Sequence, residues 1–468
     1  MEVKTARIIE YPGAAADRNG VANPHSAPPC EATTTADAVG DAQDFLDGLA
    51  ALGLTRELLQ RTAKRHLVEI QELRAENRWE DMLALLHPLE EKAPELAATE
   101  FSAPLRAELA FALGHLARYD EAIALYQQCL ELEPDSFHYH AGLAYTAYDS
   151  LYAAKGRRTL MHPTERKARI ELAHRHFQAA QALRPERVTN YYRQGMLFKQ
   201  VQNKKEQARP LFERAVRNWW AYTEEERRQR HHERKNYVKA LFNLASCELD
   251  AGLPQKALQA LQRCIAEDQE HGFIATIHKQ FALGKVFSHL GQLDHALQAL
   301  STAAAEASPE EDDYGCELTA RVQLLRADPE SAWQAVNRIP PRRRRPYVRW
   351  TEAEVLAARG EWQRAVKVLM EAAENDRRGA HKALLQLARL EFRQGRFEQA
   401  LQAALRAEHS FQQHYQNPCH HALFWQAAAL LRLNRRREAQ SAVDTLRQLQ
   451  PNYPNLGKLE RLLADSAQ

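Results

Sequence analysis

The feature that most constrains this chain is a recurring set of small and apolar residues that ends in a proline. Ala122 is followed four residues later by Tyr126, seven later by Cys129 and twelve later by Pro134. Spacings of four and seven place three side chains on one face of a helix, and proline ends the helix because it has no N–H to donate. The pattern therefore predicts a helix that packs a small-residue face against a neighbour.

The same spacing returns along most of the chain. About thirteen residues before many of these sites stands a leucine followed by a small residue, as at Leu109-Ala110 and Leu283-Gly284, which lets two helices approach closely. Neighbouring sites lie 33 to 51 residues apart, and none of these intervals falls much below the roughly 34-residue period of a two-helix repeat. The first small site of each second helix is Met82, Ala122, Ala173, Ala208, Ala257, Ala296, Ala332, Ala365, Ala400 and Ala439.

Composition agrees with stacked helices. Hydrophobic residues make up 45% of the chain and aromatic residues only 8%, a balance that suits helices better than sheets. The formal net charge is only +2, so nucleic-acid binding would have to depend on local basic clusters. The six cysteines form no CxxC pair, which is typical of reduced intracellular proteins. Without a secretory pattern or about 18 consecutive apolar residues, we expect a cytoplasmic protein with no membrane contact.

These residues resemble the tetratricopeptide-repeat (TPR) family over about residues 65 to 455. The best match runs from residues 109–110 through 119–123 to Pro134, and the second best joins residues 387–388 to 395–400 without a closing proline. The repeats marked by Ala332 and Ala439 depart from the pattern, because they lack the leucine-small pair or are rich in arginine. The resemblance implies an all-α fold: a right-handed α-solenoid of about ten helix-turn-helix repeats with terminal capping helices.

The chain can be divided on this basis. Residues 1–40 are rich in Ala, Pro, Gly, Thr and Asp, and we expect a disordered tail. A capping helix is expected over residues 41–64, repeats over 65–345, and the last repeats with a second capping helix over 346–468. Polar insertions near residues 149–167 and 221–235 lengthen two of the intervals, and we expect them to supply secondary contact surfaces.

The resemblance also implies that the first helix of each repeat lines a concave groove, with positions two, five, six and nine facing it. Aromatic residues there offer contact area, while cations and amides donate to carboxylates and to an extended peptide. The alternative is that some of the aromatics only pack between repeats. Carried over residue by residue, these positions are Asn190, Arg193, Gln194, Lys239, Phe242, Asn243, His278, Phe281, Lys285, Tyr347, Trp350, Glu354, Lys382, Gln386, Arg389, Phe424 and Trp425.

We therefore predict a non-catalytic scaffold or adaptor that docks a partner protein or an extended acidic peptide. Lys239 and Asn243 lie one helical turn apart, similar to the carboxylate clamps with which some family members hold chaperone tails. The flanking candidates Arg193 and Lys285 do not follow the pattern of that clamp. A chaperone-tail role is thus a narrower alternative within the peptide-binding prediction.

Catalytic and metal-binding patterns do not support an enzyme. The sequence contains no GxGxxG, GxxxxGK[ST], GxSxG or HExxH motif. Adjacent histidines such as His420 and His421 point about 100° apart on a helix, so they do not easily share one metal ion. Cys129 and Cys264 occupy small sites where packing explains them. We expect no catalytic residue, no metal and no cofactor.

A run of four arginines between two prolines provides the basis for a second hypothesis. Such a cluster could contact phosphates of RNA or DNA, although charge runs usually solvate a surface. The alternatives to a pure peptide scaffold are an adaptor that also binds nucleic acid, or a non-catalytic subunit of an enzyme complex. The arginines concerned are Arg342, Arg343, Arg344 and Arg345.

Overall fold

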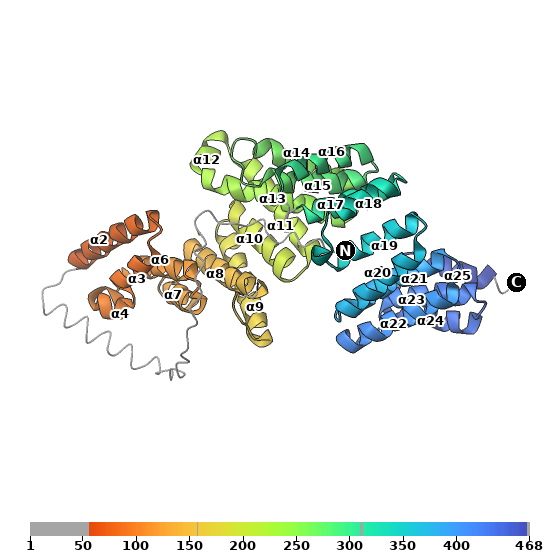
Figure 1. The fold of residues 1–468 in the computed structure, drawn as a ribbon. Helices are drawn as coiled ribbons and strands as arrows, with labels where there is room; N and C mark the ends of the chain where they lie inside the picture. The colour runs from red at the N-terminus through yellow and green to blue at the C-terminus, as the bar shows by residue number, and fades with distance from the viewer. Residues whose placement is uncertain (1–55, 157, 309–311, 466–468) are drawn as a thin grey trace. The chain divides into compact units, whose positions relative to one another are not determined.

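The computed structural model describes residues 56–156, 158–308 and 312–465, and every regular element in these ranges is a helix (Figure 1). The chain divides into two compact units, Met1–Ile274 and Ala275–Gln468, which are described separately below. The expected tail at residues 1–40 and most of the expected capping helix at 41–64 lie outside the described residues.

Unit 1 contains five pairs of packed helices, α2/α3, α6/α7, α8/α9, α10/α11 and α13/α14. Three short helices, α4, α5 and α12, connect them. The elements are α2 (Arg56–Ala75), α3 (Trp79–Leu86), α4 (Leu89–Lys92), α5 (Pro94–Ala97), α6 (Ser102–His115), α7 (Tyr119–Leu132), α8 (Phe137–Lys155), α9 (Pro163–Leu183), α10 (Val188–Met196), the π-helix η1 (Leu197–Val201), α11 (Lys205–Ala221), α12 (Glu224–Gln229), α13 (His231–Asp250) and α14 (Pro254–Glu267).

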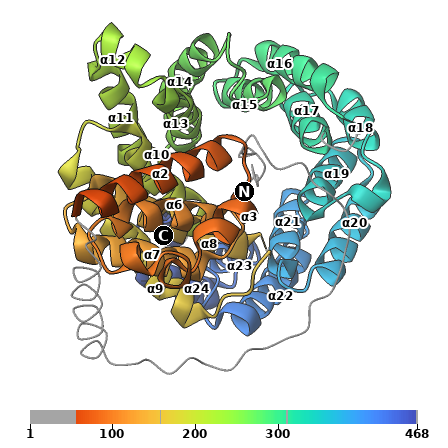
Figure 2. The ribbon, with the colours of Figure 1, turned by 90° about the vertical axis from the view of Figure 1, so that its left-hand side faces the viewer.

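Unit 2 contains five further pairs, α15/α16, α17/α18, α19/α20, α21/α22 and α23/α24, followed by a terminal helix that contacts α23 and α24. In Figure 2, α15, α17, α19 and α21 form the inner layer of this unit, and α16, α18, α20 and α22 form the outer layer. The elements are α15 (Thr276–His289), α16 (Leu293–Glu306), α17 (Asp313–Leu325), α18 (Pro329–Asn337), the 3-10 helix η2 (Pro341–Arg343), α19 (Pro346–Ala358), α20 (Trp362–Asn375), α21 (Ala380–Arg393), α22 (Phe397–Tyr415), α23 (His420–Arg432), α24 (Arg436–Leu449) and α25 (Leu456–Asp465).

The ten small sites identified in the sequence all lie on second helices. Each of them is at most 1% exposed, as expected if a side chain of limited size must fit between two helices. The repeats marked by Ala332 and Ala439, which depart from the family pattern, still form the pairs α17/α18 and α23/α24. The prediction of an all-α solenoid of helix-turn-helix repeats is therefore confirmed.

A backbone turn of one kind joins the two helices of most pairs. Five residues before nine of the ten small sites, the chain adopts a positive φ between 58° and 81°. This left-handed conformation costs an ordinary residue about 1–2 kcal/mol and costs glycine almost nothing. Glycine, as at Gly291, or asparagine occupies seven of the nine turns. The exception precedes Ala173, where the first insertion separates the helices.

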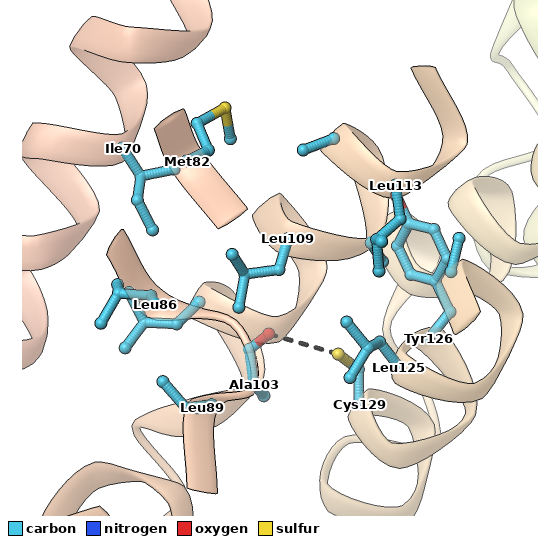
Figure 3. Close-up of a cluster of buried hydrophobic side chains, with 14 of the residues drawn as sticks. Ile70, Met82, Leu86, Leu89, Ala103, Leu109, Leu113, Leu125, Tyr126 and Cys129 are labelled. Atoms are coloured by element: carbon cyan, nitrogen blue, oxygen red, sulfur yellow. Dashed lines mark hydrogen bonds between the residues drawn. The ribbon is translucent and has the colours of Figure 1, made fainter. Parts of the chain in front are cut away.

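Leucines and small residues from successive helices form the core. In unit 1, Ile70, Met82, Leu109 and Leu113 are completely buried between α2, α3 and α6 (Figure 3). The Cys129 thiol donates to the carbonyl of Ala103 at 3.3 Å, so this cysteine packs between helices α6 and α7.

The first insertion is mostly helical. It extends α8 to Lys155, and α9 then begins at Pro163. Two cations of the insertion are bonded to carbonyls at the end of η1: Lys155 to the carbonyl of Gln200, and Arg166, through Nη2, to that of Val201 at 2.7 Å. The insertion therefore braces the following repeat.

The π-helix itself absorbs one additional residue. A small residue of the first helix precedes the small site by twelve residues at Gly284 and Ala296, but by thirteen at Gly195 and Ala208. The widened turn, in which the Gln202 amide donates to the Leu197 carbonyl, keeps both small sites at the helix contact.

Among the described residues, no helix is long and apolar enough to cross a bilayer.

Candidate peptide-binding surface

In unit 1, the predicted groove residues of α10 and α13 are largely buried. Asn190, Lys239, Phe242 and Asn243 are 2%, 6%, 6% and 8% exposed. Lys199 donates through Nζ to Asn243 Oδ1 at 2.9 Å, and Asn243 donates through Nδ2 to the carbonyl of Lys239 at 2.7 Å. These side chains therefore join first helices of neighbouring repeats, and the Asn243 amide is already engaged.

Lys239 differs from these neighbours. Its ammonium group has no hydrogen-bond acceptor and no carboxylate within ion-pair distance among the described residues. Burial, followed by repulsion from Lys235 one turn earlier, lowers the pKa of Lys239 to about 8, and Asp268 partly opposes this shift. A largely buried lysine without an anionic partner costs stability, so an anion brought to this position would recover part of that cost.

Arg193 and Gln194 are held by residues of the preceding repeat. The Arg193 guanidinium lies 3.5 Å from the centroid of the Tyr145 ring. Gln181 donates through Nε2 to Gln194 Oε1 at 2.8 Å, and Gln194 Nε2 lies 3.2 Å from His174 Nδ1. Of the two, Arg193 remains partly exposed and keeps donors for a ligand.

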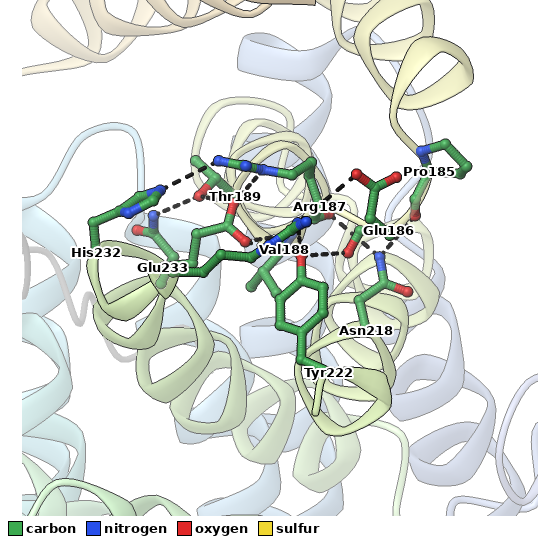
Figure 4. A network of polar contacts seen from close by, with 11 residues as sticks. Pro185, Glu186, Arg187, Val188, Thr189, Asn218, Tyr222, His232 and Glu233 are labelled. Atoms are coloured by element: carbon green, nitrogen blue, oxygen red, sulfur yellow. Dashed lines mark hydrogen bonds and ion pairs between the residues drawn. The ribbon is translucent and has the colours of Figure 1, made fainter. Parts of the chain in front are cut away.

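The second insertion is fixed by a buried carboxylate, Glu233 (Figure 4). Glu233 is completely buried and accepts hydrogen bonds from Arg187 Nε at 3.0 Å, Thr189 Oγ1 at 3.1 Å, Tyr222 OH at 3.0 Å and the Val188 amide at 3.4 Å. These contacts tie the start of α13 to the start of α10. The polar insertion thus has a structural anchor of its own.

In unit 2, the predicted positions alternate between paired and accessible side chains. Tyr347 stacks on Tyr314 with a centroid separation of 5.4 Å, and Arg389 forms an ion pair with Glu354. Trp425 packs edge-on against Phe392. The remaining predicted residues are exposed at Lys382 and partly exposed at His278, Phe281, Lys285, Trp350, Gln386 and Phe424.

A buried acidic residue that the sequence analysis did not include lies in the same layer. Glu317 of α17 is 4% exposed and accepts a hydrogen bond from Thr351 Oγ1 at 2.6 Å. Burial raises the pKa of Glu317 above its usual range. Glu317 stands at position five of its repeat, where an acidic residue does not fit the basic groove that the sequence predicts.

The arginine run makes contacts inside unit 2. Arg343 pairs with Asp313 at 2.9 Å, and Arg344 pairs with Glu352 at 2.6 Å, with both side chains of the second pair less than a tenth exposed. Arg345 donates to the hydroxyl of Tyr314 at 3.3 Å, and Arg342 is exposed. A phosphate would therefore have to compete with carboxylates for two of the four guanidinium groups.

The histidine and cysteine positions offer little for metal or thiol chemistry. In the described ranges, no group of three or more His, Cys, Asp or Glu residues is placed to hold a metal ion. His420 and His421 lie against each other, and His421 Nδ1 is 2.7 Å from the hydroxyl of Tyr453. Burial raises the pKa of Cys129 to about 12, which disfavours the reactive thiolate.

Comparison with known proteins agrees with this architecture. Sequence models described as tetratricopeptide repeat match residues 103–136, 199–271, 351–415 and 385–456. No curated protein matches the sequence.

Several solved structures have similar helix arrangements at low sequence identity. A tetratricopeptide repeat protein from Parabacteroides merdae is 14% identical (TM-score 0.43) over 58% of this chain and 99% of its own. A chain of the APC/C hetero-tetramer Cut9-Hcn1 is 13% identical (TM-score 0.40) over 91% of this chain and 88% of its own. A chain of the Naa15/Naa10 complex bound to HypK-THB is 16% identical (TM-score 0.41) over 92% of this chain and 78% of its own.

Proposed function

Because the chain is a tetratricopeptide-repeat protein, with the architecture of a protein-interaction scaffold, we propose that its first helices dock an extended acidic peptide or a C-terminal carboxylate of a partner protein. The observation that carries the proposal is Lys239, which is 6% exposed and has no anionic partner among the described residues.

An ion pair between a peptide carboxylate and Lys239 would contribute more binding free energy than an ion pair on the surface. The cost of burying the ammonium is already present in the free protein, so the peptide adds the attraction without adding that cost. Lys235 lies one turn away on α13, and burial lowers its pKa as well. Two desolvated lysines on one helix favour an anion over a neutral ligand.

Other residues of the first helices would supply contacts of lower charge. Arg193 can donate to a peptide carbonyl beside Tyr145. In unit 2, Trp350, Gln386 and Lys382 are among the predicted groove residues that keep exposed surface. Phe242 is buried and contributes by packing. This fold generally serves binding and not catalysis, so the proposal assigns no reaction.

The proposal is tested with a peptide array that contains acidic peptides, their amide counterparts and the same sequences with free or amidated C-termini. The full-length chain is expected to bind acidic members most strongly. Lys239→Met should weaken them about 10- to 100-fold, the value of one charge-assisted hydrogen bond of about 1.5–3 kcal/mol.

Lys256→Met is the matched control, because Lys256 lies exposed on the second helix of the same repeat. It should leave binding unchanged. Equal binding by the two variants, or equal binding of acidic and amide peptides to the unmodified chain, would contradict the proposal.

A further inference from the structure

Helix α8 carries a row of three tyrosines, Tyr145, Tyr148 and Tyr152. The ring centroids of Tyr145 and Tyr148 are 6.2 Å apart, and those of Tyr148 and Tyr152 are 6.1 Å apart. Steps of three and four residues keep the rings on one face of the helix. The row reaches Tyr152 because α8 continues into the first insertion and ends at Lys155.

An acidic residue, Asp149, interrupts this row. It lies four residues after Tyr145 and three before Tyr152, and is therefore on the same face. Asp149 is partly exposed, and no hydrogen bond or ion pair is formed by its carboxylate within the described part of the chain. Such a carboxylate, held among phenol rings, is under-solvated.

Among the described residues, no cation forms an ion pair with Asp149. Burial raises the pKa of Asp149 to about 6, and among the described residues Arg193 opposes the shift. The guanidinium of Arg193 is stacked on Tyr145 at 3.5 Å, so it attracts the carboxylate from a distance without closing an ion pair. Tyr119 of α7 is near enough for the Asp149 carboxylate to raise the pKa of its phenol, in addition to the larger effect of burial.

We propose that Asp149 receives a lysine or arginine side chain of the docked peptide, with Tyr119 and Tyr152 lying along the cation. The inference rests on the proposed function, because it assumes a peptide on the first helices of unit 1. It adds the chemical class of one peptide residue. The occupant follows from complementarity: a carboxylate attracts a cation, and phenol rings attract it through their negative faces.

The geometry favours this occupant over an anion or an apolar side chain. An anion would meet the carboxylate at short range, and an apolar side chain would remove the remaining water from Asp149 without replacing it. A cation replaces that water with a charge-assisted hydrogen bond. Together with Lys239, the site would read a peptide that carries both charges.

The test uses a random-sequence peptide library displayed on phage and selected against the full-length chain. Peptides selected by this chain are expected to share one Lys or Arg position. Replacing that residue with norleucine should weaken binding at least about tenfold, measured by fluorescence polarisation with synthetic peptides. The same replacement should have no effect when the protein carries Asp149→Asn.

Two controls keep failure informative. Asp135→Asn alters an exposed aspartate in the loop before α8 and should bind the selected peptides as the unmodified chain does. Tyr152→Leu keeps an apolar side chain but removes the ring, and should weaken the binding of cationic peptides more than that of their norleucine forms.

The outcomes separate the two proposals. Selected peptides without a shared cation, or with full affinity for Asp149→Asn, would overturn this inference while sensitivity to Lys239→Met would leave the acidic-peptide proposal standing. Peptides that bind Lys239→Met with full affinity but lose affinity for Asp149→Asn would support the cation site and overturn the acidic-peptide proposal. A library that yields no binder would overturn both.

Discussion

Replacing Lys239 with methionine should stabilise the protein even though it removes the proposed anion anchor. The pKa of Lys239 falls from 10.5 to about 8 on folding, a difference worth about 3 kcal/mol of unfavourable burial at neutral pH. Methionine keeps an unbranched stem of similar length and carries no charge. At pH 7 we expect a gain of up to about 3 kcal/mol, or roughly 6–12 °C in the unfolding midpoint of a unit of this size.

The pH dependence provides a sharper readout than the midpoint. Between pH 8 and about 10.5 the unfolded chain holds a proton that folded Lys239 has lost, so the free energy of unfolding of the unmodified protein rises with pH over this window. The Lys239→Met protein lacks this rise, and the gap between the two proteins should close as pH approaches 10.5.

The assay is urea unfolding followed by circular dichroism at pH 7, 8, 9 and 10, with Lys256→Met as the control for loss of a lysine. The control should follow the unmodified chain at every pH. A Lys239→Met protein that is less stable at pH 7, or whose advantage does not change with pH, would refute the view that this ammonium is buried without a partner.

Two further substitutions test the packing. Glu233→Gln should destabilise unit 1 by about 3 kcal/mol, because the amide NH2 group must face a buried donor in either orientation. Glu186→Gln is the control, at an exposed position, and should cost less than about 1 kcal/mol in the same denaturation assay. Equal losses of stability in the two variants would contradict the reasoning. Gly284→Ala would place a Cβ 2.7 Å from Leu300 Cγ and should cost about 1–3 kcal/mol. Gly457→Ala meets nothing within 4 Å and should be neutral or slightly stabilising in thermal melts, so similar melts for the two alanine variants would argue against close packing at Gly284.

The repeat pattern could be predicted from the sequence because each repeat is specified locally. The contact between two paired helices needs a small residue at a fixed offset, whatever the rest of the repeat contains, and all ten such sites are buried. The extra residue between Gly195 and Ala208 is likewise visible in the sequence. The π-helix that accommodates it receives hydrogen bonds at its end from Lys155 and Arg166, which are distant in sequence.

The polar side chains of the groove could not be assigned from the sequence in the same way. Position in the repeat predicts which way a residue faces, but not whether a neighbouring repeat supplies its partner. Lys199 bonds to Asn243 across 44 residues, while Lys239 has been left without an acceptor among the described residues. Asp149 was predicted only as the start of the first insertion, whereas in the structure it continues the helix face of α8.

The sequence by itself therefore determined the class of fold, the number of helix pairs and the position of nearly every helix contact. Only the tertiary structure decided which charged residues of the first helices are compensated and which are available to a partner. The physical reason is range: small-residue spacing acts within one repeat, whereas the pairing of a buried charge depends on groups that successive repeats bring together.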